Sequence, residues 1–235
     1  MINLLMIVAM AAEAQLPQGQ GQDQGPPSAR AVPVTVCPGP EARGKPLDVL
    51  FEDQHGSLSR VRVVGVRSGT LLYVVKDARG QGVHTALVGG LFLRSVVGMS
   101  GAVQVRYDTR LVPPRLTEGS SFSTDGDMGR PGRPDVRYRQ EFVVLGWTRL
   151  QVGRCSYDVV RLEVTTTIAG EVTRMERWFE PGLWLTLRSV TTGMDRDGNP
   201  FTRRFQAVGF EEVRTVEEPP SWEEPASEEN ATDRR

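Results

Sequence analysis

Residues 157–192 read YDVVRLEVTTTIAGEVTRMERWFEPGLWLTLRSVTT, and this stretch decides the fold. Apolar and polar residues alternate through much of it, as in a β-strand with one dry and one wet face. The turn signals Ala169-Gly170 and Pro181-Gly182 divide it into strands over residues 157–168, 172–179 and 183–192. Consecutive hairpins of long strands predict a strongly twisted antiparallel sheet.

The sequence on either side repeats this pattern of short strands and turns. Residues 90–99 fit a short helix or a buried strand, and we favour the strand. The other predicted strands cover residues 47–54, 58–66, 71–76, 83–88, 103–111, 136–145, 148–152 and 201–213. The sequence therefore predicts an all-β fold, a single antiparallel and strongly curved sheet that forms a half-barrel or a barrel.

Residues 117–134 interrupt this pattern because they are rich in Gly, Ser, Asp and Pro. We expect them to form the longest loop of the domain, and long loops are either mobile or functional. Asp125 and Asp127 lie in this stretch. Turn formation is the favoured interpretation of the pair, with loose cation binding as the alternative.

The ends of the chain differ from its middle. Residues 1–14 combine a short apolar run with Ala12-Glu13-Ala14, which is typical of a signal peptide and its cleavage site. A frayed strand or helix is the alternative, and since no Lys or Arg precedes the run, an upstream start stays open. Residues 15–30 form a predicted Gln/Gly/Pro spacer, residues 31–216 the β domain and residues 217–235 a disordered acidic tail.

Charge and hydropathy exclude two classes of protein. The net charge is −1, and residues 215–235 hold seven acidic residues against two Arg, so the tail carries −5 and the rest +4. No concentrated basic stripe stands out, which argues against nucleic-acid binding. After the N-terminal run, no apolar stretch reaches the roughly 18 residues of a spanning helix, so we expect no integral membrane protein.

Cys37 and Cys155 are the only cysteines and lie 118 positions apart. In an oxidising compartment they predict a disulfide, which would stabilise the fold by about 4–5 kcal/mol in the chain-entropy model. Two unpaired buried thiols are the alternative. With His55 and His84 the only histidines, the sequence offers too few ligands for a metal site, and we predict neither metal nor cofactor.

No group of residues predicts an active site. Gly98-Met-Ser100-Gly101 falls short of a nucleophile elbow, and both histidines precede it. Residues 195–199 (DRDGN) predict a hairpin turn rather than a calcium loop, because the glycine comes too early. Four glutamates are candidates for a catalytic acid pair: Glu163, Glu171, Glu176 and Glu180. Arginines stand near most of them in the sequence, which favours cross-strand ion pairs instead.

Four aromatic residues gather around the two clearest hairpins: Trp147, Trp178, Phe179 and Trp184. A core cluster that fixes strand register is one interpretation of this group. The other is that these side chains line a hollow for an apolar or sugar ligand, which makes them the candidate ligand-binding residues.

Residues 178–183 (WFEPGL), preceded by residues 146–153 and 155–162, resemble exported bacterial proteins of a domain-of-unknown-function group with a W-Y-x-P-x-x-G hairpin. The resemblance covers about residues 113–213. Phe179 replaces the usual Tyr, and the acidic tail is an addition. The group is similar in architecture to periplasmic lipoprotein carriers and lipocalin-like half-barrels, which implies an envelope role. No lipobox cysteine follows the predicted signal peptide, so a lipid anchor is not implied.

These observations support three hypotheses for a periplasmic or secreted protein. The first is a non-enzymatic β protein that binds an apolar small molecule or an envelope component in its curved sheet. The second is an interaction protein that docks on an envelope protein through a sheet edge and the acidic tail. The third, a hydrolase built on carboxylates, would require two acids converging in one pocket.

Overall fold

The computed structural model describes residues 36–76, 82–98, 101–111, 114–194 and 198–213. The predicted signal peptide, spacer and acidic tail lie outside the described residues. Within the described part, no helix is both long enough and apolar enough to cross a membrane. Among the residues that the structure describes, the one helical element is a 3-10 turn, η1 (Pro40–Ala42).

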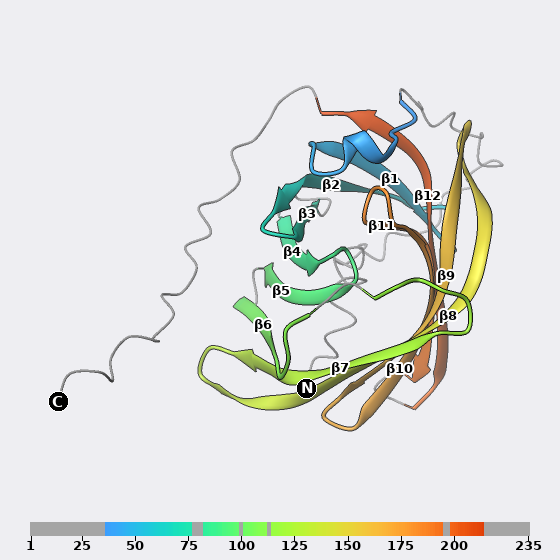
Figure 1. Ribbon diagram of the computed structural model, residues 1–235. Helices are drawn as coiled ribbons and strands as arrows, with labels where there is room; N and C mark the ends of the chain where they lie inside the picture. Colours follow the sequence, from blue (N-terminus) through green and yellow to red (C-terminus); the bar gives the residue numbers. More distant parts are fainter. Residues whose placement is uncertain (1–35, 77–81, 99–100, 112–113, 195–197, 214–235) are drawn as a thin grey trace, which may run out of the picture.

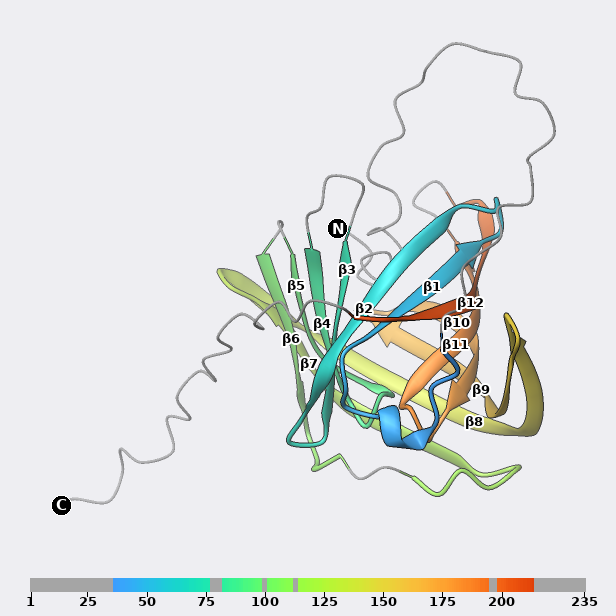
Figure 2. The same cartoon turned by 90° about the horizontal axis from the view of Figure 1, so that it is seen from above.

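Twelve antiparallel strands close into a barrel (Figures 1 and 2). Each strand pairs with the next one along the chain, and β1 pairs with β12 to complete the ring. The prediction of an all-β barrel is confirmed. The strands are β1 (Leu47–Asp53), β2 (Leu58–Arg67), β3 (Thr70–Lys76), β4 (Gly82–Val88), β5 (Phe92–Gly98), β6 (Gly101–Tyr107), β7 (Ser121–Arg130), β8 (Arg133–Val152), β9 (Cys155–Ile168), β10 (Glu171–Glu180), β11 (Leu185–Met194) and β12 (Pro200–Glu212).

The wall of the barrel is uneven. Seen along the barrel in Figure 1, the short strands β3 to β6 form one side and the long strands β8 to β10 the other. The pairing of β8 with β9 runs from Tyr138 opposite Ile168 to Val152 opposite Cys155. By contrast, β6 has four residue pairs with β5 and four with β7. The long side therefore contains the longest ladder of the sheet.

The loop predicted over residues 117–134 was wrong. Residues 121–130 form β7, and β8 begins at Arg133, so the stretch contains one arm of a hairpin and its turn. In the middle of β7, Thr124, Gly126 and Met128 are buried, whereas the residues between them are aspartates that are partly exposed. Gly126 and Gly129 suit this strand because a side chain there would collide with the carbonyl of Arg106 and with Asp135. Composition suggested a loop, and close packing explains the glycines.

The predicted break at Gly146-Trp147 is also absent, because β8 continues through it for 20 residues. The register shifts between Val144 and Gly146, which marks a β-bulge. Gly146 has φ 122°, a conformation that favours glycine. The glycine therefore bends a continuous strand instead of ending it.

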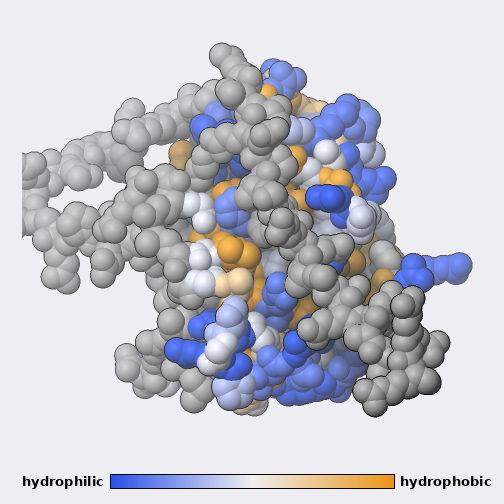
Figure 3. Space-filling model, turned by 90° about the vertical axis from the view of Figure 1, so that its left-hand side faces the viewer, coloured by the Kyte–Doolittle hydropathy of each residue, from blue (hydrophilic) through white to orange (hydrophobic). Residues whose placement is uncertain are grey.

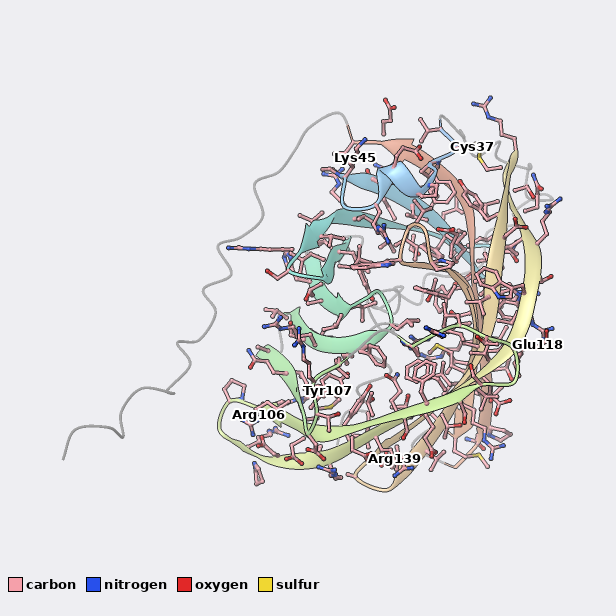
Figure 4. All side chains as sticks on the ribbon, viewed as in Figure 1. Cys37, Lys45, Arg106, Tyr107, Glu118 and Arg139 are labelled. Carbon is pink, nitrogen blue, oxygen red and sulfur yellow. A yellow bond between two sulfur atoms is a disulfide. The ribbon has the colours of Figure 1, made fainter. Side chains whose placement is uncertain are left out.

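A disulfide joins Cys37 to Cys155 at the start of β9. It holds the segment of η1 against the barrel, where Pro40 approaches Gly182 in the turn between β10 and β11. The guanidinium of Arg43 lies 5.2 Å from the ring centre of Trp184 in the same turn. Figure 4 labels Cys37 near this end of the molecule. The N-terminal segment is thus packed on one end of the barrel.

Buried apolar side chains form three clusters. The largest joins β1 to β3 with β8 to β12 and includes Val49, Val152 and Phe210. A second gathers around Phe92 and Phe142, and a small third one contains Met128 and Tyr138.

Candidate functional site: a cavity inside the barrel

The barrel contains a cavity of about 210 Å³ that is partly open. Every strand except β6 contributes a side chain to its wall. Most of the wall is apolar, for example Leu71, Val75, Leu93, Ile168 and Phe205. In Figure 3, which faces the short-strand side, hydrophobic side chains appear in the middle of the surface between hydrophilic ones. A concave, mainly apolar space with a few polar groups is the usual form of a small-molecule site.

Arg177 on β10 is the only charged side chain among the described residues that line this cavity. Its Nη1 donates a hydrogen bond to the carbonyl oxygen of Leu91 at 3.3 Å, and its Nε lies 3.0 Å from Sδ of Met175. Within the described part of the chain, no carboxylate lies within ion-pair distance of it. Burial lowers the pKa of Arg177 because desolvation disfavours the charged form. Arginine nonetheless stays protonated in proteins, so the interior contains a positive charge.

Three tyrosines lie close enough to this guanidinium to act on its pKa: Tyr73, Tyr107 and Tyr138. Burial raises the pKa of Tyr138 to about 12, and the nearby Arg177 opposes that rise. Burial also raises the pKa of Tyr73 and of Tyr107, which Figure 4 labels on β6. All three phenols are therefore neutral at physiological pH, and none supplies a negative charge to Arg177.

A second polar group faces the cavity from β8. Gln140 is 3% exposed, and its Nε2 donates a hydrogen bond to Oγ1 of Thr166 at 3.4 Å. Its Oε1 is buried and has no hydrogen-bond partner. A buried acceptor without a partner costs about 1–3 kcal/mol, and such a group in a cavity wall calls for a ligand or an ordered water.

Trp184 lines the cavity and also contacts Arg43, which directly follows η1. Its φ is 61°, which is unusual for a large residue, and its backbone packs against Gly90. A Cβ on Gly90 would lie 2.3 Å from the carbonyl oxygen of Trp184, so only glycine fits this contact. The indole contacts two of the apolar clusters and also lines the cavity.

The structure places the four candidate aromatic residues in different surroundings. Trp184 lines the cavity, whereas the other three are absent from its described wall. Phe179 is buried in the cluster around Phe92, and Trp178 lies between Arg161 and Arg188, whose Cζ atoms are 5.7 and 4.4 Å from its ring centre. Trp147 is 53% exposed.

The predicted cross-strand ion pairing is present for Glu176, which accepts hydrogen bonds from Nε and Nη2 of Arg161 at 2.8 and 2.6 Å. Glu180 instead accepts hydrogen bonds from the backbone N–H groups of Gly182 and Leu183. It fixes the turn before Trp184. Burial raises the pKa of Glu180, and these hydrogen bonds oppose the shift. No two of the predicted glutamates converge in the described cavity wall.

Asp125 and Asp127 are neutralised by arginines of β8. Nη2 of Arg137 lies 3.9 Å from Oδ1 of Asp125, and its Nη1 lies 3.5 Å from Oδ1 of Asp127. Nη1 of Arg139 lies 3.6 Å from Oδ1 of Asp125. Figure 4 shows Arg139 where β7 and β8 run side by side. The described residues contain no cluster of three or more metal-ligating side chains. Residues 195–197 of the DRDGN run and Ser100 lie outside the described residues.

Sequence reasoning missed Arg177 and Gln140 as cavity residues. It assigned Arg177 to a cross-strand ion pair because glutamates stand near it in the sequence. Strand parity carried the relevant signal: Arg177 shares the face of the buried Thr173, and Gln140 shares that of the buried Tyr138 and Phe142. A polar residue in a row of inward-facing positions is the informative exception.

The described residues define a twelve-stranded antiparallel barrel with a mainly apolar cavity, and Arg177 is the one charged side chain in its described wall. No protein-family model matches the chain, and no curated protein matches it either. Among solved structures, it is similar to the hypothetical lipoprotein YmcC from Escherichia coli (K12), with 14% identity, 70% of this chain and 85% of that chain covered and a TM-score of 0.43. It is also similar to a putative exported protein with a YmcC-like fold from Bacteroides fragilis, with 12% identity, 72% and 97% covered and a TM-score of 0.41.

Proposed function

We propose that this protein is an exported, non-enzymatic barrel that binds an apolar small molecule in its interior. The cavity of about 210 Å³ carries the proposal. It exceeds the roughly 150 Å³ cavity that holds benzene in another protein, and it lies below the roughly 300 Å³ at which pockets for drug-sized ligands begin. A short hydrocarbon chain or a small ring system fits this range.

Two observations support export. The predicted signal peptide over residues 1–14 is one, although it lies outside the described residues. The other is the Cys37–Cys155 disulfide, because disulfides persist in the periplasm and outside the cell and are rare in the reducing cytosol.

The docking hypothesis has less support. Each of the twelve described strands pairs with two neighbours, so most of the sheet edge is covered. Residues 145–152 of β8 pair with β9 alone and are the longest edge left for an added strand in the described part of the chain. The acidic tail lies outside the described residues. Docking through that tail stays a prediction.

Calorimetric titration of the purified, disulfide-bonded protein with 1-octanol tests ligand binding. We expect saturable binding with a negative heat-capacity change, the mark of apolar surface being buried. Ser189 lines the cavity opposite Arg177 in the β10–β11 pairing, so Ser189→Trp should fill the space and abolish binding. Thr192→Trp is the control, because Thr192 is exposed on the same strand.

Two results would contradict the proposal. One is the absence of octanol binding to the native protein, and the other is equal binding by Ser189→Trp and the native chain. Native mass spectrometry of protein purified from the envelope of its host, with thiols blocked before unfolding, tests export separately. A mass two hydrogens below that of the reduced chain is expected, and free thiols would argue against export.

A further inference from the structure

We infer that Arg177 binds the anionic end group of the ligand, so that the natural ligand is an amphipathic molecule with a short apolar body and a carboxylate or another terminal oxyanion. This inference rests on the proposed function. It adds that the ligand has one charged end, that this end lies at Arg177, and that Arg177 selects anionic ligands over neutral ones.

The first argument is the isolation of the charge. Arg177 is the only charged group in the described cavity wall, and no described carboxylate pairs with it. The side chain of Arg177 is half-buried, and its surroundings desolvate the guanidinium. A desolvated charge without a counter-ion is costly, and charges inside proteins are almost always paired. A ligand anion would supply the missing partner.

The second argument is the number of unused donors. A guanidinium has five N–H donors in a planar fork. Two of them point to Leu91 and Met175, and the other three have no acceptor among the described residues. The planar fork matches the two oxygens of a carboxylate, and hydrogen bonds between such charged groups are about twice as strong as neutral ones.

The third argument is that the surrounding groups are neutral. Tyr73, Tyr107 and Tyr138 keep their protons at physiological pH because burial raises the pKa of each phenol. They lie near the arginine without neutralising it. Tyr107 donates its hydroxyl proton to the carbonyl oxygen of Leu93 at 2.7 Å, so its ring is held in place.

Gln140 supplies an independent sign that the cavity is built for a polar ligand atom. Its unpaired Oε1 belongs to a side chain that is 97% buried, and Gln140 lines the same cavity. An acceptor in this position would be satisfied by a hydroxyl or amide donor on the body of the ligand. Arg177 and Gln140 are thus two polar contacts in an otherwise largely apolar wall.

Three probes with the same eight-carbon chain separate the end group from the body: octanoate, octyl sulfate and 1-octanol. Calorimetry at neutral pH with the disulfide-bonded protein is expected to show that one anionic probe or both bind about 10- to 100-fold more tightly than octanol, the range for hydrogen bonds to charged groups. The tighter of the two anions identifies the end group.

Arg177→Met keeps the length of the side chain and removes its charge. We expect it to lose the preference for anions while octanol binding is retained. Replacing a buried charge with an apolar side chain is often neutral or stabilising, so this variant should unfold at the same urea concentration as the native protein or at a higher one. Arg177→Lys should keep part of the preference. The control is Arg188→Met, because Arg188 stacks on Trp178 and is absent from the described cavity wall.

The outcomes distinguish this inference from the proposed function. Equal affinity of native protein for octanol and both anions would overturn the role of Arg177 and leave apolar binding intact. Strong destabilisation of Arg177→Met with an unchanged anion preference would show a structural arginine and also overturn it. If none of the three probes binds, the proposed function itself fails.

Discussion

Arg62 on β2 forms two parallel hydrogen bonds with Asp48 on β1: Nε donates to Oδ1 at 2.8 Å, and Nη2 donates to Oδ2 at 2.9 Å. Asp48 is 3% exposed, which is rare for an aspartate. Its strand closes the barrel by pairing with β12 on its other side. The ion pair therefore ties β2 to the closing strand.

Asp48→Ala should lower the free energy of unfolding by about 2–3 kcal/mol, because it leaves the guanidinium of Arg62 partly buried without its carboxylate. Urea denaturation measures the change. The matched control is Asp158→Ala, which breaks the exposed Arg149–Asp158 pair and should cost less than about 1 kcal/mol. If both variants lost the same free energy of unfolding, the burial of Asp48 would not strengthen its ion pair, and the prediction would be wrong.

Loss of the disulfide should destabilise the barrel by up to about 4–5 kcal/mol, because Cys37 and Cys155 close a loop of 118 residues. The double variant Cys37→Ser, Cys155→Ser measures the effect by urea denaturation. Reduction of the native protein should give the same loss, and the reductant should leave the double variant unchanged. Identical unfolding curves for oxidised and reduced native protein would refute this prediction.

Gly90→Ala should destabilise the protein more than Gly69→Ala. Both glycines have φ 74°, so both alanines carry the same backbone strain. The new Cβ at Gly90 would collide with the backbone of Trp184, whereas nothing lies within 4 Å at Gly69. We expect an additional loss of about 1–3 kcal/mol for Gly90→Ala, measured by urea denaturation. Equal stabilities of the two variants would mean that the Trp184 turn gives way freely.

The four tyrosines of the chain should ionise late in the native state. Burial raises the pKa of all four, to about 12 for Tyr138 and Tyr157. A raised native pKa contributes stability that is fully present below about pH 10, the unfolded value, and is lost as the pH rises towards 12. Absorbance at the tyrosinate band should therefore stay low at pH 10 in the native protein and rise on unfolding in urea. If the tyrosines of the native protein ionised near pH 10, as free tyrosine does, the predicted rise of their pKa would be wrong.

Most strands followed from the sequence because turn signals and alternation are local, but β7 was missed and β8 was divided in two. The error at residues 117–134 has a physical cause: Gly126 and Gly129 make way for a neighbouring carbonyl and a carboxylate, and composition cannot distinguish such glycines from those of a loop. The sequence did not decide between a closed barrel and a half-barrel. Closure depends on whether β1 pairs with β12, and no short stretch of sequence encodes a pairing between the two ends of the domain.

The candidate site was harder to predict than the fold. Trp184 was a candidate and does line the cavity, but its positive φ and its contact with Gly90 depend on two segments that are distant in the sequence. Arg177 stands between Glu176 and Trp178, and its neighbours along the chain suggested an ion pair. The strand sends those neighbours to the opposite face, so the decisive contacts of Arg177 come from other strands.

The uneven wall has a consequence for how the molecule fluctuates. Because β6 is joined to β5 and to β7 by four residue pairs each, the hydrogen bonds broken by separating it are few, whereas the β8–β9 ladder extends from Tyr138 to Val152. Local opening costs least where the ladder is shortest, so the amide protons of β6 should exchange with solvent well before those of β8. The ring of Tyr107, which acts on the pKa of Arg177, belongs to this strand. Breathing at β6 would expose the inner charge to solvent while the long side of the barrel stays folded.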